Sequence, residues 1–128
     1  MTSAVPAAQD YMAEYGLAGW LLRDYLDANS VFWSILGRRV RNVTRPCWLF
    51  VPVSGKPTLL AHAVDVGRFA DPEDDNTAGP DLQASASRET MLETLRSLLP
   101  SGGRVAMEYS PEGALPRVGR VDAGSVEL

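Results

Sequence analysis

Apolar residues recur along the N-terminal third of the chain with two periods, and each period indicates a different element. Residues 6–15 carry alanines, tyrosines and a methionine at helical spacing, and Gly16 is well placed to end that helix. The run WLL at 20–22 is too short for a helix and predicts a buried strand. Asn29 is a suitable N-cap for a short, very apolar helix that Gly37 would end.

The middle of the chain predicts a β-hairpin. The run CWLFVPV at 47–53 is apolar throughout, which is typical of a central strand. SGKP at 54–57 predicts a turn, and TLLAHAV at 58–64 predicts the returning strand. A basic connection precedes the hairpin at 38–46, and residues 66–69 suggest a short further strand.

The C-terminal half alternates between polar and apolar segments. Residues 71–81 (DPEDDNTAGPD) have no periodicity, which predicts a solvated acidic loop. Ser87 can cap a helix over 88–99, whose leucines form an amphipathic stripe. RVAMEY at 104–109 predicts a strand with Val105, Met107 and Tyr109 on one face, and SPEG then interrupts it.

The remaining residues predict a helix-like tail. Val118 and Val121 are three residues apart, as on one helix face, and the sequence ends on the apolar Val126 and Leu128. Helices interspersed with apolar strands, one tight hairpin included, predict an α/β fold in which a mixed β-sheet is flanked by helices. At 128 residues the chain is one domain's worth of sequence.

Composition and charge exclude several classes of function. The net charge of −4 argues against a general nucleic-acid binder. One cysteine allows no intramolecular disulfide. No apolar run approaches the ~20 residues of a membrane span, and the first residues do not resemble a signal peptide. We therefore expect a cytoplasmic protein without a membrane or nucleic-acid partner.

Residues that could carry chemistry are sparse. His62 lies in an apolar strand, which favours a packed, hydrogen-bonded histidine, and Cys47 begins a buried strand, which favours a structural thiol over a nucleophile. Glu108 and Glu112 flank a turn and invite an acid/base hypothesis, but no partner group can be argued to lie near them, so structural roles are favoured. The acidic run at 71–75 fails the EF-hand spacing.

The strongest indication of a binding site in the sequence is a cluster of four arginines between the second helix and the hairpin: Arg38, Arg39, Arg41 and Arg45. The planar guanidinium fork suits carboxylate and phosphate recognition. The cluster therefore predicts either an anion-binding or partner-binding loop, or a solvated loop that balances the acidic chain.

Three stretches, in the same order, resemble the N-terminal domain of the creatinase/prolidase/Xaa-Pro aminopeptidase family of metallopeptidase-like proteins. They are GWLL with the helix that follows at 19–37, RPCWLFVPVSGKP at 45–57, and AMEYSP at 106–111 with VDAG at 121–124. The resemblance implies that 1–128 is a single creatinase-type N-terminal domain, a mixed sheet with helices and a ribonuclease H-like motif.

The resemblance also implies a function for the chain. In the family, two Asp, a His and two Glu hold two metal ions in a C-terminal "pita-bread" domain, whose motifs are not found in this sequence. No catalytic, cofactor-binding or metal-binding residue is therefore carried over, and we expect no enzyme activity and no cofactor. The implied role is a non-catalytic accessory and oligomerisation domain of a metal-dependent Xaa-Pro peptidase (prolidase or aminopeptidase P) or creatinase-like hydrolase, where it shapes subunit contacts and active-site access.

Family members usually continue beyond the VDAG stretch. The apolar ending at Val126 and Leu128 therefore predicts self-association, as a homo-oligomer such as a dimer, or contact with the protein's own catalytic domain. An alternative is a stand-alone binding module that uses the Arg38–Arg45 loop for an anionic ligand or acidic peptide. A small independent enzyme is the least supported reading, because no set of acid, base, nucleophile or metal ligands can be assembled.

Overall fold

The computed structural model describes residues 4–70, 79–114 and 119–128. Its elements, in chain order, are α1 (Ala4–Glu14), β1 (Gly19–Asp24), α2 (Ser30–Leu36), β2 (Cys47–Pro52), β3 (Thr58–His62), α3 (Val66–Phe69), β4 (Asp81–Ser85), α4 (Arg88–Leu98), β5 (Val105–Ala106), the 3-10 turn η1 (Pro111–Gly113) and α5 (Ala123–Val126). None of the helices within these ranges is long and apolar enough to cross a membrane.

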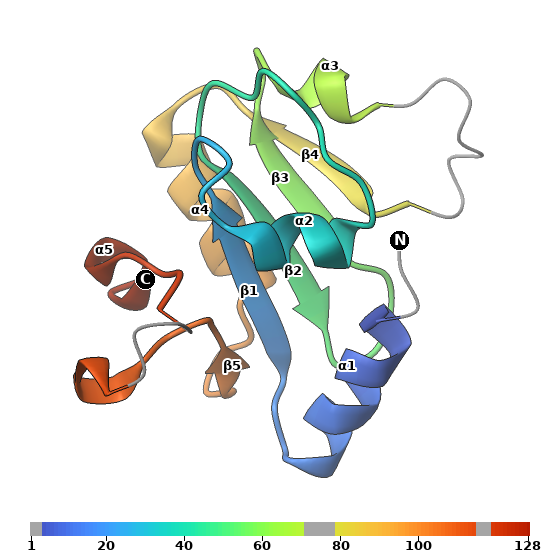
Figure 1. Ribbon diagram of the computed structural model, residues 1–128, viewed down its shortest axis with the longest axis vertical. Helices are drawn as coiled ribbons and strands as arrows, with labels where there is room; N and C mark the ends of the chain where they lie inside the picture. The colour runs from blue at the N-terminus through green and yellow to red at the C-terminus, as the bar shows by residue number, and fades with distance from the viewer. Residues whose placement is uncertain (1–3, 71–78, 115–118) are drawn as a thin grey trace.

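The five strands form one mixed sheet in the order β4-β3-β2-β1-β5 (Figure 1). β2 pairs antiparallel with both β1 and β3, whereas β4 is parallel to β3 and β5 is parallel to β1. Four strands therefore run in one direction and only β2 runs against them. The carboxyl ends of β1, β3 and β4 consequently meet at one edge of the sheet.

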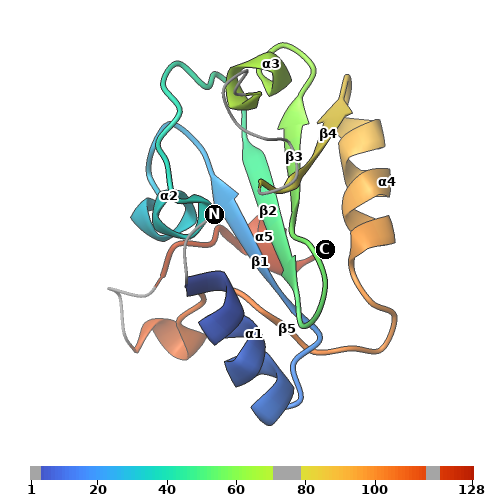
Figure 2. The ribbon, with the colours of Figure 1, turned by 90° about the vertical axis from the view of Figure 1, so that its right-hand side faces the viewer.

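Helices cover the two faces of the sheet unequally. α1 and α2 lie on one face and α4 lies on the other, as the edge-on view shows (Figure 2). The short α3 and α5 lie at the margins, α3 near one end of the sheet and α5 beside β1 (Figure 1). This arrangement confirms the predicted α/β fold with a mixed sheet flanked by helices.

Side chains alternate between the two faces of the sheet along each strand, so the molecule has two hydrophobic cores, one on each face. In β2, Leu49 and Val51 pack toward α1 and α2, while Trp48 and Phe50 pack toward α4 in one cluster with Leu95. Strand side chains alternate between faces, so an apolar run such as CWLFVP fills both cores at once. The central strand was predicted for this reason, and the structure confirms it.

Local capping signals set the helix ends that the sequence predicted. The Asn29 side chain accepts hydrogen bonds from the backbone N–H groups of Val31 and Phe32, and Gly37 ends α2 with a φ of 84°. Ser87 and Thr90 form a capping box at the start of α4. Because these contacts join near neighbours in sequence, they can be recognised without the fold.

Several predicted elements differ from the observed ones. Residues 66–69 form the helical turn α3 and not a strand, because the Arg68 N–H turns back to donate to the Asp65 carbonyl at 2.9 Å. Strand β4 was not predicted, since its residues are polar and largely exposed; it begins at Asp81, which was assigned to the acidic loop. The rest of that loop lies mainly outside the described residues.

Strand β5 is shorter than the predicted strand over 104–109. It pairs with Gly19 and Trp20 of β1 through Val105 and Ala106 only. Beyond it, the Tyr109 N–H donates to the Met107 carbonyl at 2.8 Å, which turns the chain away from the sheet. The predicted tail helix is the single turn α5, and Val118 lies outside the described residues.

Gly19 offers a test of how tightly β1 packs against β2. A Cβ on Gly19 would lie 2.5 Å from the ring of Phe50, which is only 6% exposed, whereas a Cβ on Gly67 in α3 would meet nothing within 4 Å. We predict that Gly19→Ala lowers the free energy of unfolding by about 1–3 kcal/mol, because the ring must shift in a packed core. Urea denaturation should show Gly67→Ala unchanged or slightly more stable; equal stability of the two variants would contradict this packing.

Candidate functional site

Polar side chains gather at the edge where the carboxyl ends of β1, β3 and β4 meet. Arg23 projects from the face of β1 that carries Leu21, by strand alternation, and Trp48 is its cross-strand partner. His62 lies two residues after Leu60 on the same face, and Ser85 is its partner in β4. These polar side chains therefore lie on the same face of the sheet as the apolar side chains that α4 covers, but closer to the carboxyl ends of the strands.

These residues line a pocket of about 380 Å³, which we call the strand-end pocket. Its walls come from the sheet, from the loop before β2, from the first turns of α4 and from the C-terminal segment. The lining residues used below are three arginines, one histidine, three serines, one aspartate and five apolar residues: Arg23, Arg45, Arg88, His62, Ser85, Ser87, Ser125, Asp122, Pro46, Trp48, Met91, Leu92 and Leu128.

Three arginines line the strand-end pocket, and they come from three separate segments. The Arg23 Cζ lies 5.5 Å from the centroid of the Trp48 ring, a cation–π contact. Arg45 donates from Nη1 to the Thr44 hydroxyl at 3.1 Å. Arg88 is exposed, and the structure gives it no ion pair with another described residue.

Asp122 is the one acidic side chain among the described residues that line the pocket. The Ser125 hydroxyl donates to Asp122 Oδ1, and Arg23 Nη1 lies 3.5 Å from the same oxygen. The hydrogen bond from Ser125, with a smaller contribution from the Arg23 charge, lowers the pKa of the Asp122 carboxyl. Asp122 therefore stays ionised at neutral pH and compensates one of the three arginines.

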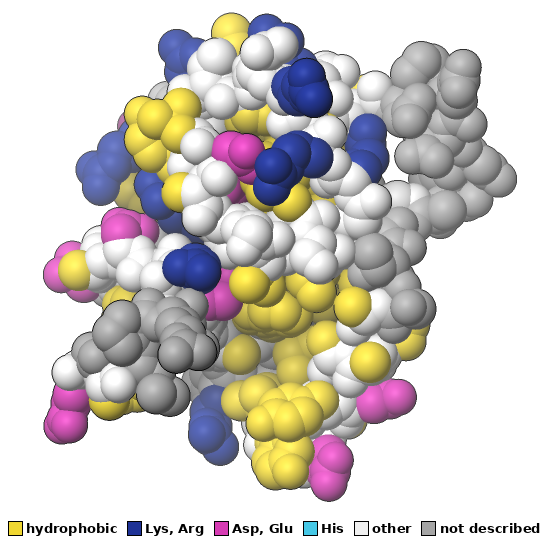
Figure 3. Space-filling model, viewed as in Figure 1, with side chains coloured by type: hydrophobic (Ala, Val, Ile, Leu, Met, Phe, Trp, Pro, Cys, Tyr) yellow, Lys and Arg dark blue, Asp and Glu magenta, His cyan; other side chains and the backbone are white. Residues whose placement is uncertain are grey.

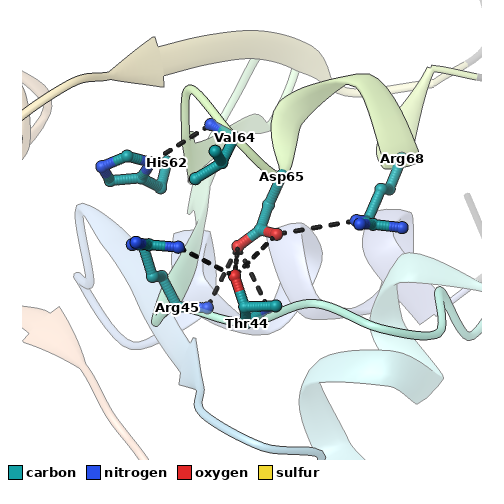
Figure 4. Close-up of polar contacts among 6 residues, drawn as sticks. All are labelled: Thr44, Arg45, His62, Val64, Asp65 and Arg68. Atoms are coloured by element: carbon teal, nitrogen blue, oxygen red, sulfur yellow. Dashed lines mark hydrogen bonds and ion pairs between the residues drawn. The ribbon is translucent and has the colours of Figure 1, made fainter.

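The loop that presents Arg45 is held by a buried carboxylate (Figure 4). Asp65 is 1% exposed and accepts hydrogen bonds from the Thr44 and Arg45 backbone N–H groups, at 3.1 and 3.0 Å, and from the Thr44 hydroxyl. Arg68 pairs with it at 3.6 Å. Arg45 and His62 lie on one side of Asp65 and Arg68 lies on the other (Figure 4).

His62 is hydrogen-bonded, as the sequence predicted. Its Nδ1 accepts from the Val64 N–H at 3.1 Å, so in the neutral ring the proton is on Nε2. The side chain is only partly buried and lines the strand-end pocket. His62 therefore lines the pocket with its Nδ1 already occupied by a backbone hydrogen bond.

The structure separates the four arginines that are close in sequence. Arg38 donates to the Phe69 carbonyl, and Arg39 pairs with Asp27 at 3.3 Å. Arg39 and Arg41 line a second depression of about 500 Å³, and Arg45 alone reaches the strand-end pocket. Lys and Arg side chains are visible over the part of the molecule that carries this loop (Figure 3).

The other candidate residues have structural contacts. Glu108 accepts hydrogen bonds from Trp20 Nε1 at 2.9 Å and from Asn29 Nδ2 at 2.8 Å, whereas Glu112 is exposed. The two carboxylates therefore do not share a site. Burial, reinforced by the nearby Asp24 charge, raises the pKa of the Cys47 thiol, which is consistent with the structural thiol that was predicted.

The two apolar residues predicted for self-association differ in exposure. Leu128 packs against the core under α4, whereas Val126 is 49% exposed. Across the described part of the chain, no group of three or more His, Cys, Asp or Glu residues is placed to hold a metal ion.

Sequence reasoning missed Arg23, Trp48, Ser85 and Arg88 as a group. Each comes from a different element, and their meeting depends on the strand order. Only one feature of the sequence pointed to this site: Arg23 is a charged residue directly after the apolar run of β1, at the carboxyl end of a strand.

Solved structures of Xaa-Pro hydrolases share this fold. The creatinase/prolidase N-terminal domain of an X-Pro dipeptidase from Streptococcus pyogenes aligns with 78% of this chain and 70% of that chain, with a TM-score of 0.56 and 17% sequence identity. A prolidase from Thermococcus sibiricus aligns with 90% of this chain but 30% of its own, with a TM-score of 0.61 and 13% identity. The chain thus spans about a third of that prolidase.

No protein-family model matches the sequence, and no curated protein matches it either. The structural likeness, at these low identities, establishes the fold. The chain has the fold of creatinase/prolidase N-terminal domains, as its sequence resemblance implied.

The structural role of the Glu108 carboxylate can be tested with Glu112 as the matched control. In Glu108→Gln the amide nitrogen would face one of the two donors, Trp20 Nε1 or Asn29 Nδ2. We predict a loss of about 1–3 kcal/mol in the free energy of unfolding, because a partly buried donor is left unpaired. Glu112→Gln should change stability by less than about 0.5 kcal/mol in the same urea titration, since its side chain is exposed. A neutral Glu108→Gln would contradict the contacts.

Proposed function

We propose that this chain is the N-terminal accessory domain of an Xaa-Pro peptidase-like protein. The fold that it shares with the N-terminal domain of an X-Pro dipeptidase carries the proposal. The three sequence stretches that resemble the family support it, because they fall on β1 with α2, on the β2–β3 hairpin, and on the C-terminal segment. Hydrolysis would belong to a separate metal-binding domain of the full-length protein, and this chain would act in the cytoplasm.

In this proposal the domain contributes contacts between subunits and limits access to the active site. Exposed apolar side chains support a contact role. Tyr11 and Tyr15 of α1 are 57% and 55% exposed with ring centroids 4.4 Å apart, and Val126 is exposed at the opposite margin. Hydrophobic side chains gather over α1 and in the region between α1 and α2 (Figure 3).

A stand-alone binding module that uses the Arg38–Arg45 loop is the alternative proposal. The exposed Arg39 and Arg41 favour it, since both line the depression beside Trp33. Binding of an acidic peptide that is lost in Arg39→Ala and Arg41→Ala would support the loop as the functional surface.

The accessory role predicts that the purified chain has no peptidase activity. We expect no cleavage of Xaa-Pro dipeptides with added Mn²⁺ or Co²⁺, because hydrolysis is assigned to another domain. A prolidase assayed in parallel under the same metal concentrations is the positive control. Reproducible cleavage that copurifies with this chain would overturn the proposal.

The contact role predicts self-association of the chain in solution. We expect light scattering to give a dimer at high concentration and Val126→Asp to shift it toward monomer, because a charge would be buried at the interface. Glu127→Gln, at the next residue, is the control that leaves the apolar side chain in place. Leu128 is less suited to the test, since it is partly buried against the core. A monomeric wild-type chain would contradict the prediction.

A further inference from the structure

We propose that the strand-end pocket binds a small organic anion, a carboxylate or phosphate attached to an apolar body. The inference is independent of the accessory role, since it concerns a cavity on the α4 side of the sheet. In this proposal Arg23, Arg45 and Arg88 bind the charged group of the ligand. Trp48, Met91 and Leu92 contact its apolar part.

The charge of the pocket is the first argument. The whole chain has 12 Lys and Arg against 16 Asp and Glu, yet three arginines line this single cavity of about 380 Å³ with one acidic side chain among its described lining residues. Asp122 compensates Arg23 alone, at 3.5 Å. Like charges brought together repel one another, and a bound anion removes that repulsion.

The origin of the three arginines is the second argument. They come from the end of β1, from the loop that Asp65 holds and from the first turn of α4, so the fold brings together residues that are far apart in sequence. The carboxyl ends of strands in α/β sheets are a common place for ligands. The positive end of the α4 dipole lies at the same margin and adds to the attraction for an anion.

The apolar wall is the third argument and sets the ligand class. Trp48, Met91 and Leu92 line the pocket, so an apolar body attached to the anion has side chains to pack against. The volume lies within the range of small-molecule pockets and exceeds what an inorganic ion alone fills.

Two aromatic anions test the proposal, phenyl phosphate and phenylacetate, which share a ring and differ in the charged group. We expect calorimetry on the full chain to detect binding of at least one, and the better binder identifies the anion class. In NMR spectra the indole N–H signal of Trp48 should shift more than those of Trp20 and Trp33. Benzyl alcohol and inorganic phosphate, which each lack one half of the ligand, should bind at least about tenfold more weakly.

Substitutions locate the site. Arg88→Gln and Arg45→Gln should each weaken binding about tenfold, because each removes a charge-assisted contact. Arg96→Gln is the matched control, since Arg96 is exposed on the same helix as Arg88 but does not line the pocket. Circular dichroism on each variant checks that the fold is intact.

Three outcomes would overturn the proposal. The first is that neither aromatic anion binds at millimolar concentration. The second is that binding survives Arg88→Gln and Arg45→Gln but is lost in Arg39→Gln with Arg41→Gln, which would place the anion at the loop. The third is that inorganic phosphate binds as tightly as phenyl phosphate, which would leave the apolar wall without a role.

Discussion

Asn29 is the junction on which the rest of the structure depends. It is 2% exposed, and its backbone N–H donates to the Asp24 carboxylate at 2.8 Å while its side-chain oxygen caps α2. Its amide nitrogen donates to the Arg23 carbonyl and to Glu108. One buried side chain thus joins the end of β1, the start of α2 and the C-terminal segment, and each of its polar atoms has a partner. Buried polar networks of this kind fix a single arrangement when all their members are satisfied.

The same end of the molecule holds the strand-end pocket. Arg23 follows the apolar part of β1, and its carbonyl is bound by Asn29 while its guanidinium lies over Trp48. Asp65 similarly holds the backbone of Arg45, because its carboxylate accepts a hydrogen bond from the Arg45 N–H. Arg23 and Arg45 are therefore presented by backbone segments that the Asn29 amide and the buried Asp65 carboxylate hold in place, and this preorganisation is what a binding site needs.

The elements that could be predicted from the sequence depend on near neighbours, and those that could not depend on the fold. Asn29, Gly37 and Ser87 mark helix ends through contacts within a few residues, and the β2–β3 hairpin follows from two apolar runs around a tight turn. Strand β4 has mostly exposed, polar residues, so only its main-chain pairing with β3 defines it. The pocket was missed because its cations come from three elements, whereas the arginine cluster in the sequence is divided between separate surfaces.

Cys47 has a consequence for how the stability of this protein can be followed. Its thiol is buried in the core that the sheet shares with α1 and α2, donates weakly to the Asp24 carbonyl, and has a pKa raised by burial. It is the only cysteine in the chain, so a thiol-specific reagent has one target, which stays protonated and inaccessible until the core on this face of the sheet opens. The rate of labelling therefore reports opening of this core, and the native sequence already contains a probe of its own unfolding.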